Sequence, residues 1–189
     1  PQEPTGSVAE ALARNVGGRE VLLRPLPSSV EVGETAVTRA LSDREAVRHL
    51  VLILGDQLDA ESAALADLDP VSDVVCMFEV PYESTRTWSH VARTAVFLSA
   101  MRHFAAALTE RGIRCDYAQL GRHTHPTLDL ALTDAVRRHR PHRVVMVEAG
   151  EWQIAQNLAS TCAELGVPLD TRVDTHFLVS RDAFAQWAG

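Results

Sequence analysis

The sequence has few cysteines and no long apolar run. Its three cysteines, Cys76, Cys115 and Cys162, lie far apart and form neither a CxxC pair nor another spacing typical of zinc or iron–sulfur ligands. No apolar run approaches the roughly 20 residues that cross a bilayer as a helix, and residues 1–4 resemble no signal peptide. We therefore expect a cytoplasmic protein with reduced thiols, no bound metal and no membrane partner.

Positive charge is also scarce. The chain has 18 lysines and arginines against 25 aspartates and glutamates, which gives a net charge of −7, and its pI is near 5.6. A domain that grips phosphates usually presents a basic face. We therefore expect no direct nucleic-acid binding by these residues.

Common catalytic and phosphate-binding motifs are missing as well. The sequence contains no GxGxxG or P-loop glycine pattern, no nucleophile elbow and no HExxH pair. No residue is therefore predicted to be catalytic, and we expect the chain alone to be non-catalytic. Because the sequence begins at Pro1 without an initiator methionine, we expect it to be part of a longer protein.

The composition that is present is that of a globular domain, with 46% hydrophobic and 23% charged residues. Residues 1–46 are interpreted as an N-terminal extension or linker, because two prolines and a glycine interrupt residues 24–34. Short elements are expected within this region at 8–14, 20–23 and 36–47. Residues 47–189 are expected to form a single domain.

From residue 49 onward, buried apolar runs alternate with amphipathic segments. The run 50–54 (LVLIL) stops at Gly55, which is typical of a central parallel strand covered on both faces. Strands are expected at 50–54, 73–79, 114–120, 143–148 and 168–173. Helices are expected at 59–67, 91–111, 127–139, 151–165 and 180–187, the longest with an apolar stripe of Val96, Phe97, Ala100, Phe104, Ala107 and Leu108. The alternation predicts an α/β fold with a doubly wound, mainly parallel five-stranded sheet and helices on both faces.

Ligands of such sheets bind beyond the carboxyl ends of the strands, which directs attention to three loops. The candidate binding residues there are Asp56 in the first loop, Glu79 and Glu83 in the second, and Glu148 and Glu151 in the third. Carboxylates accept hydrogen bonds from ring N–H groups or from sugar-alcohol hydroxyls. Each loop also has a structural interpretation: a helix cap at Asp56, a solvated loop over 79–90, and a favourable first-turn charge at Glu151.

Four strings together resemble one family. They are LVLILGDQL at 50–58, LSAMRHF at 98–104, EAGEW at 148–152 and FLVSRDAFAQW at 177–187. In this order and spacing they resemble the photolyase-related proteins that carry an iron–sulfur cluster, a group of bacterial cryptochromes and prokaryotic (6-4) photolyases. The resemblance spans about residues 49–188. Each string alone is weak evidence for the family, but the four together are specific to it.

The resemblance implies a Rossmann-like antenna domain that holds 6,7-dimethyl-8-ribityllumazine. It also implies a partner, a helical catalytic domain with FAD and a [4Fe–4S] cluster, which repairs (6-4) photoproducts in DNA; the residues of that domain are not in this sequence. By position, Asp56, Gln57, Glu79 and Glu83 are expected beside the lumazine. Phe78, which stands where the family often has cysteine, is also expected to contact the chromophore.

Further departures from the family pattern leave two alternatives open. Arg86 stands at a position that is often aromatic, and Ser89-His90-Val91 replaces a basic stretch. The first alternative is a chromophore-free scaffold or interaction domain with the same fold. The second is an independent nucleotide- or coenzyme-binding enzyme, in which the carboxylate cluster holds a metal.

Overall fold

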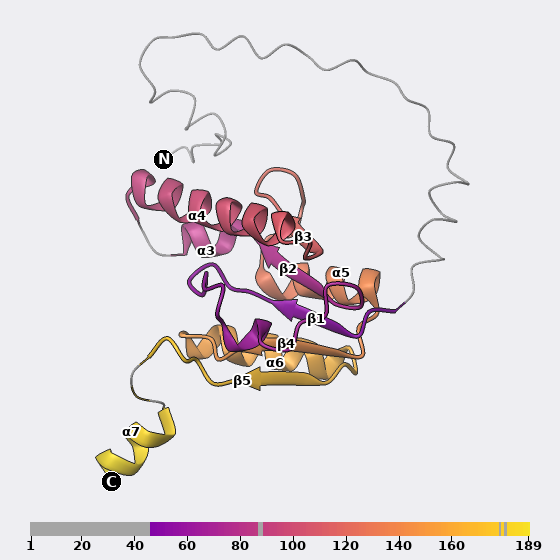
Figure 1. Cartoon of the computed structure of the whole chain (residues 1–189). Coiled ribbons are helices and arrows are strands. Elements are labelled where there is room, and N and C mark those ends of the chain that lie inside the picture. The colour runs from indigo at the N-terminus through magenta and orange to yellow at the C-terminus, as the bar shows by residue number, and fades with distance from the viewer. Residues whose placement is uncertain (1–45, 87–88, 178, 180) are drawn as a thin grey trace, which may run out of the picture. The chain divides into compact units, whose positions relative to one another are not determined.

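A computed structural model of the chain describes residues 46–86, 89–177, 179 and 181–189 (Figure 1). The chain divides into two units, Pro1–Thr38 and Arg39–Gly189, and every described residue belongs to the second. The elements expected at 8–14 and 20–23 lie outside the described residues, as does most of the one expected at 36–47. Val47, its expected last residue, is not helical, and its N–H donates to the carbonyl of His139 at 3.1 Å.

The sheet has five strands, all parallel, in the order β3-β2-β1-β4-β5. The strands are β1 (His49–Leu52), β2 (Val74–Phe78), β3 (Cys115–Ala118), β4 (Arg143–Val147) and β5 (Leu169–Arg172). All five expected strands are confirmed and are one to three residues shorter than expected, with β1 beginning one residue earlier, at His49. The order places β1 at the centre, so that the chain winds outward first toward β3 and then toward β5. This is the doubly wound, Rossmann-like arrangement that the sequence predicts.

The helices match the predicted pattern except between the first two strands and in the second loop. They are η1 (Ala63–Leu65), α3 (Pro81–Thr85), α4 (Val91–Glu110), α5 (Leu128–His139), α6 (Trp152–Glu164) and α7 (Arg181–Ala188). The helix expected at 59–67 is wrong: only a 3₁₀ turn forms there, begun by the Ser62 hydroxyl, which accepts from the N–H of Ala64. The proposed Ser180 cap of α7 lies outside the described residues.

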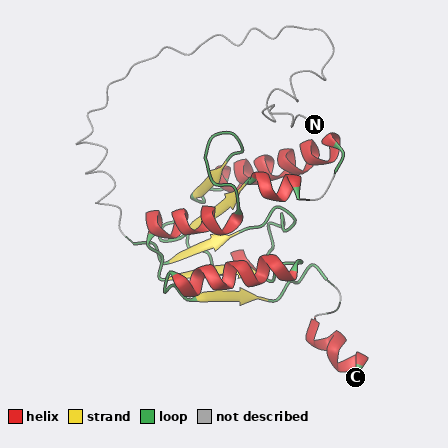
Figure 2. Cartoon of the chain, turned by 180° about the vertical axis from the view of Figure 1, so that it is seen from behind, coloured by secondary structure: helices red, strands yellow, loops and turns green. Residues whose placement is uncertain are grey.

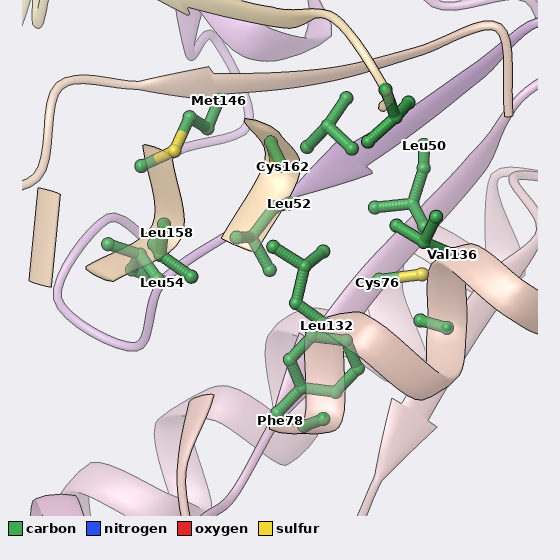
Figure 3. Packing of buried hydrophobic residues seen from close by; sticks show 14 of the residues in the cluster. Leu50, Leu52, Leu54, Cys76, Phe78, Leu132, Val136, Met146, Leu158 and Cys162 are labelled. Atoms are coloured by element: carbon green, nitrogen blue, oxygen red, sulfur yellow. The ribbon is translucent and has the colours of Figure 1, made fainter. Parts of the chain in front are cut away.

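Alternating strand residues build two cores, one on each face of the sheet. In β1, Leu50 and Leu52 join the cluster covered by α5 and α6, whereas Val51 joins the cluster covered by α4 and η1. Figure 3 shows the first cluster, in which Leu132 of α5 packs toward the strand side chains. Figure 2, seen from behind, shows α5 and α6 in front of the sheet, running roughly along the strands. Helices therefore cover both faces, as predicted.

The apolar stripe expected on α4 is only partly correct. Val96 is 70% exposed and Phe97 is 43% exposed, whereas the buried residues are Met101, Ala105 and Leu108. All three lie in the C-terminal half of the helix, which packs on the sheet. The N-terminal half extends past the carboxyl ends of the strands (Figure 1) and has no sheet beneath it. This overhang makes α4 one wall of the region where a ligand is expected.

Candidate functional site

A cavity lies at the carboxyl edge of the sheet, under the overhang of α4. Its volume is about 350 Å³, within the range typical of small-molecule sites. Five of the seven residues predicted to bind a ligand line it: Asp56, Phe78, Glu79, Glu83 and Glu151. The structure therefore brings together side chains from β2 and from the segments that follow β1, β2 and β4.

The other two predicted residues lie beside this cavity. Gln57 lines an adjoining hollow of about 410 Å³, which it shares with Asp56, and Glu148 lines another of about 360 Å³. The Gln57 side-chain amide donates to the carbonyl oxygen of Glu148 at 2.7 Å. This bond joins the loops after β1 and β4, the two strands between which the winding of the sheet reverses, where ligands of such folds bind.

Gly55 lets α4 approach the end of β1 closely. A Cβ at this position would lie 2.6 Å from the Phe97 ring and 2.8 Å from the sulfur of Met101. Both distances are shorter than van der Waals contact. A larger residue would therefore displace the ends of these two side chains, whose packing against Gly55 shapes the wall of the cavity.

Glu79 is buried and forms the most highly connected polar centre of the site. Arg102 of α4 donates to both carboxylate oxygens at 2.7 and 2.8 Å, and the N–H of Leu120 donates at 2.9 Å. The Tyr117 hydroxyl donates to the same carboxylate. Burial alone raises the pKa of Glu79, but these hydrogen bonds outweigh it and hold the pKa below its ordinary value. Glu79 thus ties β2, β3 and α4 together at the edge of the cavity.

Glu83 has a different electrostatic environment, on α3 within the second loop. Burial raises the pKa of its carboxyl; the nearby Arg86 opposes this effect, and the negative charges of Glu151 and Asp56 add to it. Glu83 therefore binds a proton more readily than an ordinary glutamate. A carboxyl of this kind is able to donate or accept a hydrogen bond.

Arg86 and Glu151 form an ion pair in the cavity wall. Both terminal nitrogens of the guanidinium bind the carboxylate, and the guanidinium lies 5.9 Å from the centre of the Tyr82 ring. The pair links α3 to the residue that precedes α6. Glu151 is the N-cap residue of α6, but its side chain makes no capping hydrogen bond and binds Arg86 instead, a partner that the sequence did not reveal.

Two buried polar atoms of this region have no hydrogen-bond partner among the described residues. They are the Oε1 atom of Gln57 and the hydroxyl of Ser89, which lines the cavity. Buried polar groups are nearly always satisfied in folded proteins. Unsatisfied atoms at a cavity wall therefore favour a polar ligand that completes their hydrogen bonds.

Comparison with known proteins agrees with this geometry. The model of one family, described as deoxyribodipyrimidine photo-lyase-related protein, matches residues 51–189. The chain belongs to this photolyase-related family. It is also 34% identical over 143 residues to a (6-4) photolyase of Agrobacterium fabrum (strain C58 / ATCC 33970). That match covers 74% of this chain but 28% of the relative, so the chain spans less than a third of that protein's length.

Several residues of this photolyase-related site were not predicted from the sequence. Arg102 lies within the LSAMRHF string, but nothing local indicates that it pairs with Glu79. Tyr117 lies on β3, where all four residues are partly buried, and His123 places Nε2 2.9 Å from the Glu79 carbonyl oxygen. These partners come from segments 23 to 44 residues away from Glu79, so only the folded arrangement identifies them.

The surface ion pair of this photolyase-related chain is expected to add little stability. Arg86→Gln and Glu151→Gln should each leave the urea midpoint of unfolding nearly unchanged, because both side chains are more than a third exposed and solvent screens their attraction. The double variant supplies the control through a double-mutant cycle. A large loss of stability in either single variant would mean that the pair is essential to the fold.

Within the described part of the chain, no helix combines the length and the apolar character needed to cross a membrane.

Proposed function

We propose that this part of the chain is an antenna domain that binds 6,7-dimethyl-8-ribityllumazine. When bound, the chromophore absorbs light and passes the excitation energy to a flavin held elsewhere. The proposal is carried by one observation: a cavity at the strand ends lined by hydrogen-bonding groups, with the unsatisfied Ser89 hydroxyl in its wall. A ring system bearing a polyol chain requires both apolar walls and hydroxyl partners.

The lining supplies both kinds of contact. Phe78, Phe97 and Met101 offer apolar surface for the ring. Asp56 and Glu83 are the proposed anchors of the ribityl hydroxyls, because both line the cavity and the Glu83 carboxyl lies close enough to Asp56 for that charge to raise its pKa. Glu79 has a supporting part in the proposal, since Arg102, Tyr117 and Leu120 already donate to its carboxylate. Gln57 and Glu148 are proposed to hold the adjoining loops in position.

The proposed partner is a flavin-binding catalytic domain of the same protein. The matched relative is named a (6-4) photolyase, and most of its length lies outside the match. We propose that FAD, a [4Fe–4S] cluster and DNA repair belong to such a domain, and that this chain does not contact nucleic acid directly. The net charge of −7 supports the last point.

Removing one proposed anchor should weaken chromophore binding. Asp56→Ala is expected to reduce the affinity for 6,7-dimethyl-8-ribityllumazine at least about tenfold, because a hydrogen bond to a charged group contributes about 1.5–3 kcal/mol. The measurement is a fluorescence titration of chromophore-free protein. Asp182→Ala on α7 is the matched control, since Asp182 lines none of the three hollows described. Equal affinity in the Asp56→Ala variant and the wild type would contradict this anchoring role.

A chromophore-free scaffold is the second candidate, and one observation favours it. Arg86 and Glu151 both line the cavity and bind each other there, so their charges are already satisfied without a ligand. If the wild-type protein does not bind the lumazine in the same titration, the scaffold function is the better proposal.

A further inference from the structure

A cysteine, an aspartate and a histidine meet on the face of the sheet that α5 covers, away from the cavity. Cys76 of β2 and Asp116 of β3 are direct partners in the parallel register, so their side chains point to the same face. His139 is the last residue of α5. One potential ligand atom from each residue lies within 4.8 Å of the other two.

This cluster has apolar surroundings on one side and is partly exposed to solvent on the other. Cys76 is fully buried in the core, beside Leu132 and Val136 of α5 (Figure 3). The side chains of Asp116 and His139 are 20% and 12% exposed. Both outer groups are therefore in partial contact with solvent, and the buried thiol lies behind them.

We propose that Cys76, Asp116 and His139 form a binding site for a zinc ion. A thiol sulfur, an imidazole nitrogen and a carboxylate oxygen are the donor types that zinc prefers, and water would complete a four-coordinate site. Zinc bonds of about 2.0–2.3 Å place tetrahedral donors roughly 3 to 4 Å apart. The observed spacing therefore needs only a small contraction around the ion.

Charges and protons balance when zinc binds to these three residues. The Cys76 thiol releases its proton to solvent on binding, and the resulting thiolate together with the Asp116 carboxylate offsets the two charges of the ion. The hydrogen bond between His139 Nε2 and Asp116, now 2.6 Å, is replaced by bonds to the metal. The imidazole binds in its neutral form, so the Nε2 proton of this bond passes through solvent to Nδ1. Arg138 lies 2.9 Å from Asp116 Oδ2 and keeps the carboxylate oriented, as outer partners of metal ligands commonly do.

Such a site would join β2, β3 and α5, three segments that are distant in sequence. An ion that binds only the folded chain stabilises it in proportion to its concentration relative to the dissociation constant. The proposed role is therefore structural. It is independent of chromophore binding, because none of the three ligands lines the cavity under α4.

Cobalt substitution tests the proposal on the full 189-residue chain. We expect one equivalent of Co²⁺ to bind with a thiolate-to-cobalt charge-transfer band and to be displaced by Zn²⁺. Cys76→Ala should abolish the band, and His139→Gln should weaken binding at least tenfold. Cys162→Ala is a matched control because Cys162 is a buried cysteine of the same core cluster, and His142→Gln is a matched control because His142 is an exposed histidine three residues after α5.

Two results would contradict the proposed zinc site. The absence of a charge-transfer band in the wild type, or its persistence in Cys76→Ala, would mean that the cluster is only a hydrogen-bonded part of the core. If Cys76→Ala does not fold, Asp116→Asn carries the test, because its partly exposed side chain adds no packing defect. Undiminished Co²⁺ binding by Asp116→Asn and His139→Gln would then exclude the site.

Discussion

Glu79→Ala is expected to destabilise the domain by about 3 kcal/mol, the largest effect of any single change at the site. The substitution removes a buried carboxylate and leaves Tyr117 and the N–H of Leu120 without their acceptor. Breaking a buried ion pair typically costs 3–5 kcal/mol, and the low end applies because Arg102, 44% exposed, returns partly to water. Urea denaturation at neutral pH measures the loss.

The acid dependence of stability distinguishes this role from a simple packing defect. The folded pKa of Glu79 is lowered, so its ionised form stabilises the fold at neutral pH, and this contribution is lost as the pH falls through the folded pKa. Glu79→Gln should therefore flatten the loss of stability on acidification. Glu110→Gln, at the exposed end of α4, is the matched control. An acid profile unchanged by Glu79→Gln would contradict the assignment.

Gly55→Val is expected both to destabilise the domain by about 1–3 kcal/mol and to impair chromophore binding. Side-chain atoms at this position overlap the Phe97 ring and the Met101 sulfur, so the ends of these two side chains must move away from Gly55. Since both of these residues line the cavity, its wall changes shape when they move. Urea denaturation and lumazine titration of the same protein measure the two effects.

Gly150→Ala provides the control at the same edge of the sheet. A Cβ there lies 3.5 Å from the Asp56 carboxylate, which is ordinary contact. Its stability should remain close to that of the wild type. Equal behaviour of the Gly55→Val and Gly150→Ala variants would show that the approach of α4 to β1 does not shape the cavity.

The sheet was predictable from the sequence because its strands are marked by local patterns. Runs such as 50–54 are uninterrupted and apolar, as strands buried on both faces must be. The helix expected at 59–67 is replaced by a 3₁₀ turn at Ala63–Leu65, and no local pattern in this segment marks where the turn begins and ends. On α4 the buried stripe depends on where the sheet ends, and a periodic pattern contains no information on this boundary.

The sequence predicted where the site lies, but not which of its residues bind one another. The strand-end rule brings Asp56, Glu79 and Glu151 to one edge, and the structure places all three at one cavity. Their partners depend on how distant elements pack: Arg102 reaches Glu79 only because α4 crosses the end of β2. The same holds for Cys76 and Asp116, whose adjacency is set by the strand register.

The most direct test of the account is to record the absorption and fluorescence of the chain as purified and to identify by mass any ligand released on heating. We expect a bound chromophore, released as 6,7-dimethyl-8-ribityllumazine and absent from the Gly55→Val variant. A colourless protein that also fails to take up added lumazine would contradict the antenna function and leave a scaffold domain of the photolyase-related family.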